Sequence, residues 1–283
     1  MRSTNYAVLA LVSVLAGCGA ADAVGQTDEA QTGVVTGPES AHIHYQRGYA
    51  KPGGGGGTNL VDHGGPVLPT SHTVAIWWGD QTQFPADAKA GLDALLKGFG
   101  GSAFLGIEKQ YMRGASIAST FLTNYVDASA PPSRPPSTST IVSEACSVIN
   151  GNGLTADTSA IYFVFTSNFP GHTNYCAWHS YGTCNGVTIQ VAYMPNTTGM
   201  AGCDPGDLYG CNTYSQGTRS IANVTSHEFA EAITDANASA WYDSSGAENG
   251  DKCAWTFSSC VSLSTGSWQL QQEWSNAISG CQQ

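Results

Sequence analysis

Residues 226–235 read SHEFAEAITD and form the core of the most clearly helical stretch of the chain, which covers residues 220–235. His227 and Glu231 are four positions apart, so a helix places both side chains on one face, one turn from each other. Glu228 lies about 100° further round the same helix. Two side chains that can reach one ion, with a carboxylate beside them, make this helix the candidate site.

The spacing HExxE differs from the HExxH motif of zinc peptidases only in its last residue. A carboxylate oxygen is also an accepted zinc ligand, so His227 and Glu231 are predicted metal ligands. Glu228 is the predicted general base, because the corresponding glutamate of HExxH sites takes a proton from the water that zinc activates. The carboxylate ligand lowers the net charge of the site and makes that water a weaker acid.

A third ligand is expected downstream, where residues 246–253 read GAENGDKC. Glu248 is the first choice and Asp251 the second, and the spacing leaves both open. Asp243 and Asp235 are weaker candidates. Asp235 continues the stripe of His227 and Glu231, where it would support a ligand from behind. The alternative interpretation is a surface helix whose acids are simply solvated.

The N-terminal sequence predicts export. Arg2 precedes the apolar run of residues 7–16, which has the length of a signal peptide and is too short to span a membrane. The run ends in LAGC, so residues 1–17 are predicted to be a lipoprotein-type signal peptide, with lipid on Cys18 as the membrane anchor. An ordinary secretory leader is the alternative. Residues 18–62, with GGGGG at 53–57, are interpreted as a flexible tether in which His42 and His44 are solvated.

Composition narrows the classes of partner and the compartment. The 283-residue chain has a net charge of -11 and no basic cluster, which argues against nucleic acid. Nine cysteines leave eight for pairing once Cys18 is set aside, as expected in an oxidising compartment. The expected pairs are Cys176/Cys184, Cys203/Cys211, Cys253/Cys260 and Cys146/Cys281.

Apolar runs at 73–78, 161–166 and 188–193 predict strands, and residues 85–99 predict a helix. Residues 103–112 fit either a short helix or a strand. Residues 143–150 fit a helix, and the tail from Trp255 is expected to be loop and short strand. The stretches between and after the strands are expected to be cysteine-bounded, glycine-rich loops, with His172 and His179 as surface loop histidines. We therefore expect one α/β or α+β domain over residues 63–283, a zincin-like mixed sheet with an active-site helix.

Several stretches resemble the phosphate-induced, EXORDIUM-like proteins. They are HGGPVL at 63–68, VAIWWG at 74–79, CAWH at 176–179 and the region from SHEFAEAITD to the last cysteine, so the resemblance covers roughly residues 63–283. Plant members are apoplastic proteins linked to growth responses, and many lack the His and Glu residues. Bacterial members are similar to this chain in carrying HExxEA-TD, then WYD and a GxExGDxC segment, which supports residues 248–251 as the region of the third ligand.

Together these features predict a secreted, lipid-anchored, zinc-dependent metallopeptidase-like hydrolase that acts on a protein or peptide. The alternative, which the plant members suggest, is a non-catalytic cell-surface or extracellular binding protein whose metal site is structural or vestigial. Glu228 separates the two hypotheses, because a structural metal site needs no acid at that position.

Overall fold

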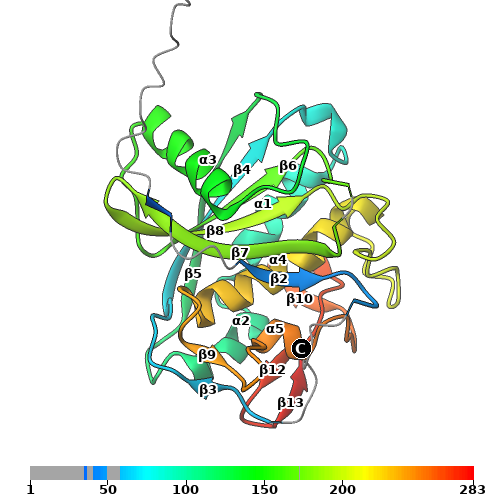
Figure 1. The fold of residues 1–283 in the computed structure, drawn as a ribbon. Coiled ribbons are helices and arrows are strands. Elements are labelled where there is room, and N and C mark those ends of the chain that lie inside the picture. The colour runs from blue at the N-terminus through cyan, green and yellow to red at the C-terminus, as the bar shows by residue number, and fades with distance from the viewer. Residues whose placement is uncertain (1–34, 37–40, 50–57, 172) are drawn as a thin grey trace, which may run out of the picture. The chain divides into compact units, whose positions relative to one another are not determined.

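The folded part of the chain is built on one mixed sheet of seven strands (Figure 1). The computed structural model describes residues 35–36, 41–49, 58–171 and 173–283. The sheet order is β1-β7-β8-β6-β4-β5, and β2 also pairs with β7. The strands are β1 (Val35–Thr36), β2 (His42–Tyr45), β4 (Thr70–Trp78), β5 (Ala118–Asp127), β6 (Ala160–Thr166), β7 (Tyr175–Cys184) and β8 (Val187–Pro195).

The centre of the sheet is parallel and its edge near β7 is antiparallel. β4 pairs in parallel with β5 and β6, and β6 with β8, whereas β7 runs antiparallel to β8. The apolar runs predicted as strands lie in β4, β6 and β8, and both of their faces are covered, as is usual for parallel strands. The mixed α/β single domain expected from the sequence is confirmed.

Helices cover both faces of this sheet. Val74, Ile76 and Trp78 pack towards α3 (Thr138–Gly151), and the alternate residues Ala75 and Trp77 belong to the opposite core. That second core includes α1 (Ala88–Phe99) and α4 (Gln216–Thr234), which lie on the other side of the sheet from α3 (Figure 1). The remaining helices, α2 (Ala103–Ile107) and α5 (Asn249–Lys252), are short. Residues 103–112 are thus helical, continuing into a 3-10 turn over Glu108–Tyr111.

α4 is buried on nearly all sides rather than amphipathic. Every residue from Thr218 to Thr234 is buried. Ser215 caps its start by accepting a hydrogen bond from the Thr218 backbone. Because the helix runs through the interior, its polar side chains His227, Glu228 and Glu231 are held in the core and not at the surface.

The structure corrects the prediction that the region before Cys184 is a loop. β7 and β8 form a hairpin, and the two residues between them are Asn185 and Gly186, with φ of 52° and 79°. An Asn-Gly pair with positive φ at both positions is the usual two-residue turn between antiparallel strands. His179 therefore lies in a strand and is buried, not in an exposed surface loop. His172 lies outside the described residues.

The expected boundary between tether and domain is also corrected for the residues that the structure describes. His42–Tyr45 forms β2 on the edge of β7, and Val61–Asp62 forms β3, which pairs with β9 (Trp241–Tyr242). These residues belong to the compact unit Gly33–Gln283 and are not a solvated tail. The predicted signal peptide, Cys18 and the glycine run at 53–57 lie outside the described residues.

All eight cysteines after Cys18 are paired, but the expected pairing is wrong. The bonds are Cys146–Cys184, Cys176–Cys203, Cys211–Cys260 and Cys253–Cys281. Cys176 and Cys184 lie near opposite ends of β7, and at about 3.3 Å per residue a strand holds them far beyond bonding reach. The bonds instead join different elements. Cys260, directly before β10 (Val261–Leu263), is bonded to Cys211, and Cys281 of β13 (Gly280–Gln282) is bonded to Cys253. β10 pairs with β11 (Gly266–Trp268), and β12 (Glu273–Ser275) pairs with β13.

Four disulfides in one domain indicate an oxidising environment, outside the cytosol, in the extracellular space or the cell envelope. Within the described ranges, no helix is long and apolar enough to cross a membrane.

One buried acid on α3 makes stability depend on pH. Burial first, and then the neighbouring Asp127 carboxylate, raise the pKa of Glu144 to about 8. In the folded state Glu144 therefore keeps its proton up to a higher pH than in the unfolded chain, where the pKa of the carboxyl is near 4.5.

We predict that the free energy of unfolding falls as pH rises from 5 to 9. Between the pKa of the unfolded chain and that of the folded state, only the folded state binds the proton of Glu144, so each rise in pH there favours unfolding. The loss attributable to Glu144 is on the order of a few kcal/mol. Urea unfolding at each pH measures it, and Glu144→Gln should flatten the curve. An unchanged slope in this variant would show that Glu144 ionises normally in the folded protein.

Candidate metal centre

α4 brings the predicted HExxE residues together in the interior. His227 Nε2 lies 3.2 Å from Glu231 Oε1, as expected for residues one turn apart. The side-chain amide of Gln271 lies 2.7 Å from His227 Nδ1 and also bonds the Gly250 carbonyl, so the ring is held with Nε2 towards Glu231. The exposed fraction of both side chains is at most 1 %.

The segment that sequence reasoning named for the third ligand folds back onto α4. The backbone N–H of Asp251 donates to Glu231 Oε1 at 2.9 Å. Donor atoms of His227, Glu231 and Asp251 all lie within 4.8 Å of one another, which is the spacing of ligands around one ion. Of the two downstream candidates, the structure thus groups Asp251, the second choice, with the two helix residues.

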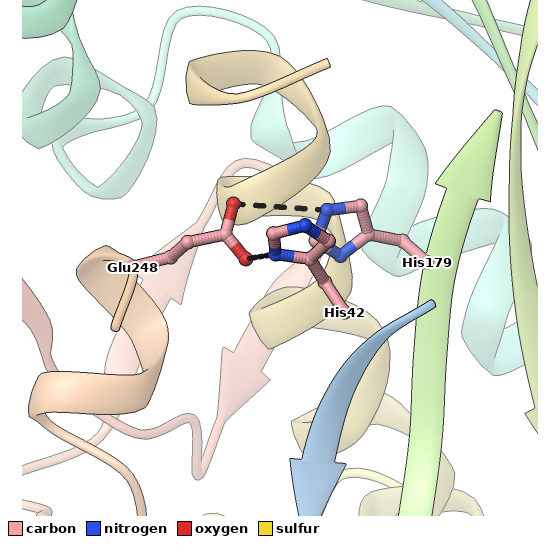
Figure 2. Close-up of side chains that lie close together, drawn as sticks. All are labelled: His42, His179 and Glu248. Atoms are coloured by element: carbon pink, nitrogen blue, oxygen red, sulfur yellow. Dashed lines mark hydrogen bonds and ion pairs between the residues drawn. The ribbon is translucent and has the colours of Figure 1, made fainter. Parts of the chain in front are cut away.

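Glu248, the first choice, belongs to a different group. It is the N-cap of α5, and Asp251 closes a capping box by accepting from the Glu248 backbone N–H at 3.3 Å. Its carboxylate points to two histidines, His42 and His179 (Figure 2). Asp251 and Glu248 therefore lie in the same turn of the chain but belong to different donor groups: Asp251 lies with His227 and Glu231, and Glu248 lies with His42 and His179.

The weaker candidates have other tasks. Asp243 accepts hydrogen bonds from the Ser245 and Ala247 backbones and pairs with Lys252, which stabilises the loop before α5. Asp235 follows the last turn of α4 and accepts from the Ser239 backbone at 2.6 Å. Neither carboxylate belongs to a three-residue donor group of the described chain.

His179 reaches the site from β7. Its Nδ1 donates to Glu228 Oε2 at 3.0 Å, and its Nε2 lies 3.8 Å from Glu248 Oε1. The same Nδ1 lies 3.6 Å from Glu231 Oε2. The Asn-Gly turn at 185–186, which predicts a hairpin and hence a strand before it, is the signal that would have placed this histidine on a sheet.

β2 adds two more histidines that the sequence assigned to the tether. His42 and His44 alternate along the strand, so both rings point to the same face, towards α4. The His44 ring lies against the His227 ring, with centroids 3.7 Å apart and the ring planes tilted by 41°, and His42 contacts Glu248. The pattern HIH in an extended segment is the signal for two imidazoles on one face. The assignment to a tether was made from composition, which does not register the order of residues.

We call these eight residues the histidine–carboxylate cluster: His42, His44, His179, His227, Glu228, Glu231, Glu248 and Asp251. They come from β2, β7, α4 and the turn at α5. His42, 17 % exposed, and Asp251 are its most open members, and the others are buried.

The cluster confines carboxylates in a place where their charge is costly. Burial raises the pKa of Glu228 well above its usual range, and the nearby Glu231 and Asp251 raise it further. Burial also raises the pKa of Glu273, a neighbouring fully buried acid, and the nearby Glu108 and Glu231 carboxylates raise it further. A cation among these groups would favour their ionised forms and remove the penalty.

The donor chemistry fits a divalent cation. Burial lowers the pKa of His44 well below its usual range, so the ring is neutral and has a free lone pair. Four atoms of the cluster have no hydrogen-bond partner among the described residues: both ring nitrogens of His44, Nε2 of His227 and Oε1 of Glu228. Neutral imidazole and carboxylate are the nitrogen and oxygen ligands of zinc.

The comparisons with known proteins were made for the whole chain. No family model, no curated protein and no solved structure matches it. The resemblance to EXORDIUM-like proteins therefore stays a prediction from the motifs, and the functional argument depends on the geometry of the cluster.

Gly250 is a position where the cluster tolerates no side chain. A Cβ there would lie 2.7 Å from His227 Nδ1 and 3.0 Å from Glu231 Oε1. At Gly106 in α2, by contrast, a Cβ meets nothing within 4 Å.

We predict that Gly250→Ala destabilises the fold by about 1–3 kcal/mol, because two buried side chains, His227 and Glu231, must move. Gly106→Ala, the matched control, should be neutral or slightly stabilising, since alanine favours a helix. Denaturant unfolding of both variants measures the effect. Equal stability of Gly250→Ala and wild type would mean that α5 does not press on His227.

Proposed function

We propose that this protein is an exported, zinc-dependent hydrolase of the metallopeptidase type. His227, Glu231 and Asp251 hold the cation, and Glu228 is the general base. The observation that carries the proposal is the convergence of these three donors within 4.8 Å, with Glu228 on the next position of the same buried helix. This combination is what hydrolytic zinc sites with a helical HExx motif require.

Glu228 is held in one orientation for its task. Its Oε2 accepts the hydrogen bond from His179, which leaves Oε1 as the atom that exchanges a proton. When bound, zinc polarises the peptide carbonyl and makes water a better nucleophile. Glu228 takes a proton from the attacking water as the new C–O bond forms. It then gives that proton to the leaving amine as the C–N bond breaks, so that protons balance.

The ligand set tunes the metal towards a milder activity than an HExxH site. Beside one neutral imidazole, the two carboxylates would offset the two positive charges of zinc, so the bound cation would polarise water less. Position and desolvation of Glu228 then carry more of the catalysis. The substrate class that fits this chemistry is a protein or peptide amide.

The compartment of the proposed activity follows from the chain's export features. The disulfides indicate an oxidising environment, and the LAGC segment predicts a lipid on Cys18 that attaches the protein to a membrane. A lipid-anchored hydrolase of this kind would act on proteins of the cell envelope or its surroundings.

A second function is favoured by one observation, the complete burial of the helix residues. His227 and Glu228 have no exposed surface, which suits a metal that only stabilises a non-catalytic binding protein of EXORDIUM type. In that protein Glu228 serves to hold His179 and transfers no proton.

Glu228→Gln separates the two functions. The amide keeps the size and the contact with His179 but cannot take a proton, so kcat/KM on fluorescently labelled casein should fall by about 10²-fold or more. Zinc content, measured by inductively coupled plasma mass spectrometry, should not change. Glu144→Gln, a buried glutamate on α3 outside the cluster, is the matched control and should keep full activity.

Bound zinc together with no hydrolysis by the wild-type protein would contradict the hydrolase and leave the structural metal. Absence of zinc from both the wild-type protein and the variant would contradict both functions.

A further inference from the structure

The cluster contains a second set of donors that the proposed catalytic ion does not use. His42, His179 and Glu248 each offer one atom, and the three atoms lie within 4.8 Å of one another. They come from β2, β7 and the N-cap of α5, as Figure 2 shows. Two imidazoles and one carboxylate are a donor set that zinc takes in proteins.

The sheet register explains why the two histidines meet. His42 and His179 are direct partners in the antiparallel pairing of β2 with β7. Side chains of such a pair stand on the same face with Cβ atoms about 4.5–5.5 Å apart. Their ring centroids are 5.1 Å apart, so both rings border the same space beside Glu248 (Figure 2).

The orientation of His179 matches that of a metal-bound histidine. Nδ1 donates to the Glu228 carboxylate, and Nε2 faces Glu248 across 3.8 Å. A carboxylate on one ring nitrogen and a metal on the other is the usual arrangement, because the acceptor fixes the tautomer and the ring.

Glu248 divides its carboxylate between the two histidines. Oε1 faces His179 Nε2 and Oε2 contacts His42 Nδ1. The capping box with Asp251 fixes the backbone from which this side chain projects. The carboxylate therefore completes a triad whose three members are positioned by three different elements.

Charge supplies a separate argument. Four carboxylates of the cluster, Glu228, Glu231, Glu248 and Asp251, carry four negative charges when ionised. One divalent cation balances two of these charges, and two cations balance all four. Buried carboxylates need such compensation.

We infer that the cluster binds a second divalent cation, zinc, through His42, His179 and Glu248. This site shares no ligand with His227, Glu231 and Asp251, and it does not require that the protein be a hydrolase. Because His42 lies on β2, the second cation fastens the N-terminal strand to the body of the domain.

The test is the number of zinc ions bound per full-length exported chain after dialysis, measured by inductively coupled plasma mass spectrometry. Wild type should hold two, and His42→Ala one. His227→Ala should also hold one, because it removes a ligand of the other ion. His72→Ala is the matched control: this histidine of β4 pairs with Asp157 outside the cluster, and the variant should keep two.

Glu248→Gln is a second variant of the same site. It is needed because His42→Ala could lose an ion by detaching β2 and not by removing a ligand. It keeps the size of the side chain on the other side of the site and should also bind one ion. A wild-type value of one or none would overturn the inference, as would two ions in both His42→Ala and Glu248→Gln. Two ions without hydrolysis of casein would sink the proposed function alone, and hydrolysis with one ion would sink the second site alone.

Discussion

Burial of carboxylates beside histidines around α4 is the constraint on which the rest of the structure depends. Ionised carboxylates lose most of their hydration in such a place, and only protons, hydrogen bonds or cations replace it. Glu228, Glu231 and Glu248 are fully buried, and each has an imidazole beside it: His179 next to Glu228, His227 next to Glu231 and His42 next to Glu248. A centre of this composition offers the nitrogen and oxygen donors that a divalent cation would take.

Two of the elements that contribute to the cluster are too short to be stable alone. β2 and α5 contain four residues each, and their positions depend on contacts with β7 and α4. Disulfides act next to them: Cys253 follows α5 directly and is bonded to Cys281, and Cys176 of β7 is bonded to Cys203. These covalent links restrict the chain where secondary structure is scarce. Metal binding and folding are expected to be coupled, because the ligands come together only in the folded chain.

The sequence predicted those parts of the protein whose physics is local. The helix of HExxE and the strands β4, β6 and β8 are long, periodic or strongly apolar, so they were predicted correctly, whereas β5, which pairs with β4 at the end of the sheet, was not predicted. β2 was missed because its stability comes from pairing with β7, which lies far along the chain, and β7 was missed although the Asn-Gly turn that joins it to β8 is a local hairpin signal. For the same reason the disulfide partners were predicted wrongly: short spacing was assumed, whereas the sheet keeps Cys176 and Cys184 apart.

The candidate site shows the same division. His227, Glu228 and Glu231 are one turn of one helix and could be named from spacing alone. Spacing left the choice between Glu248 and Asp251 open, because it depends on how a turn packs against α4. The contributions of β2 were missed because its pairing with β7 depends on contacts far along the chain, although the HIH alternation places two imidazoles on one face once the segment is extended.

The central claim is that this buried cluster is a metal centre. Anomalous diffraction at the zinc absorption edge, from crystals of the protein grown with zinc, tests it most directly. The account predicts an anomalous peak bounded by His227, Glu231 and Asp251. No peak at these residues, with the carboxylates bonded to one another through protons, would contradict it.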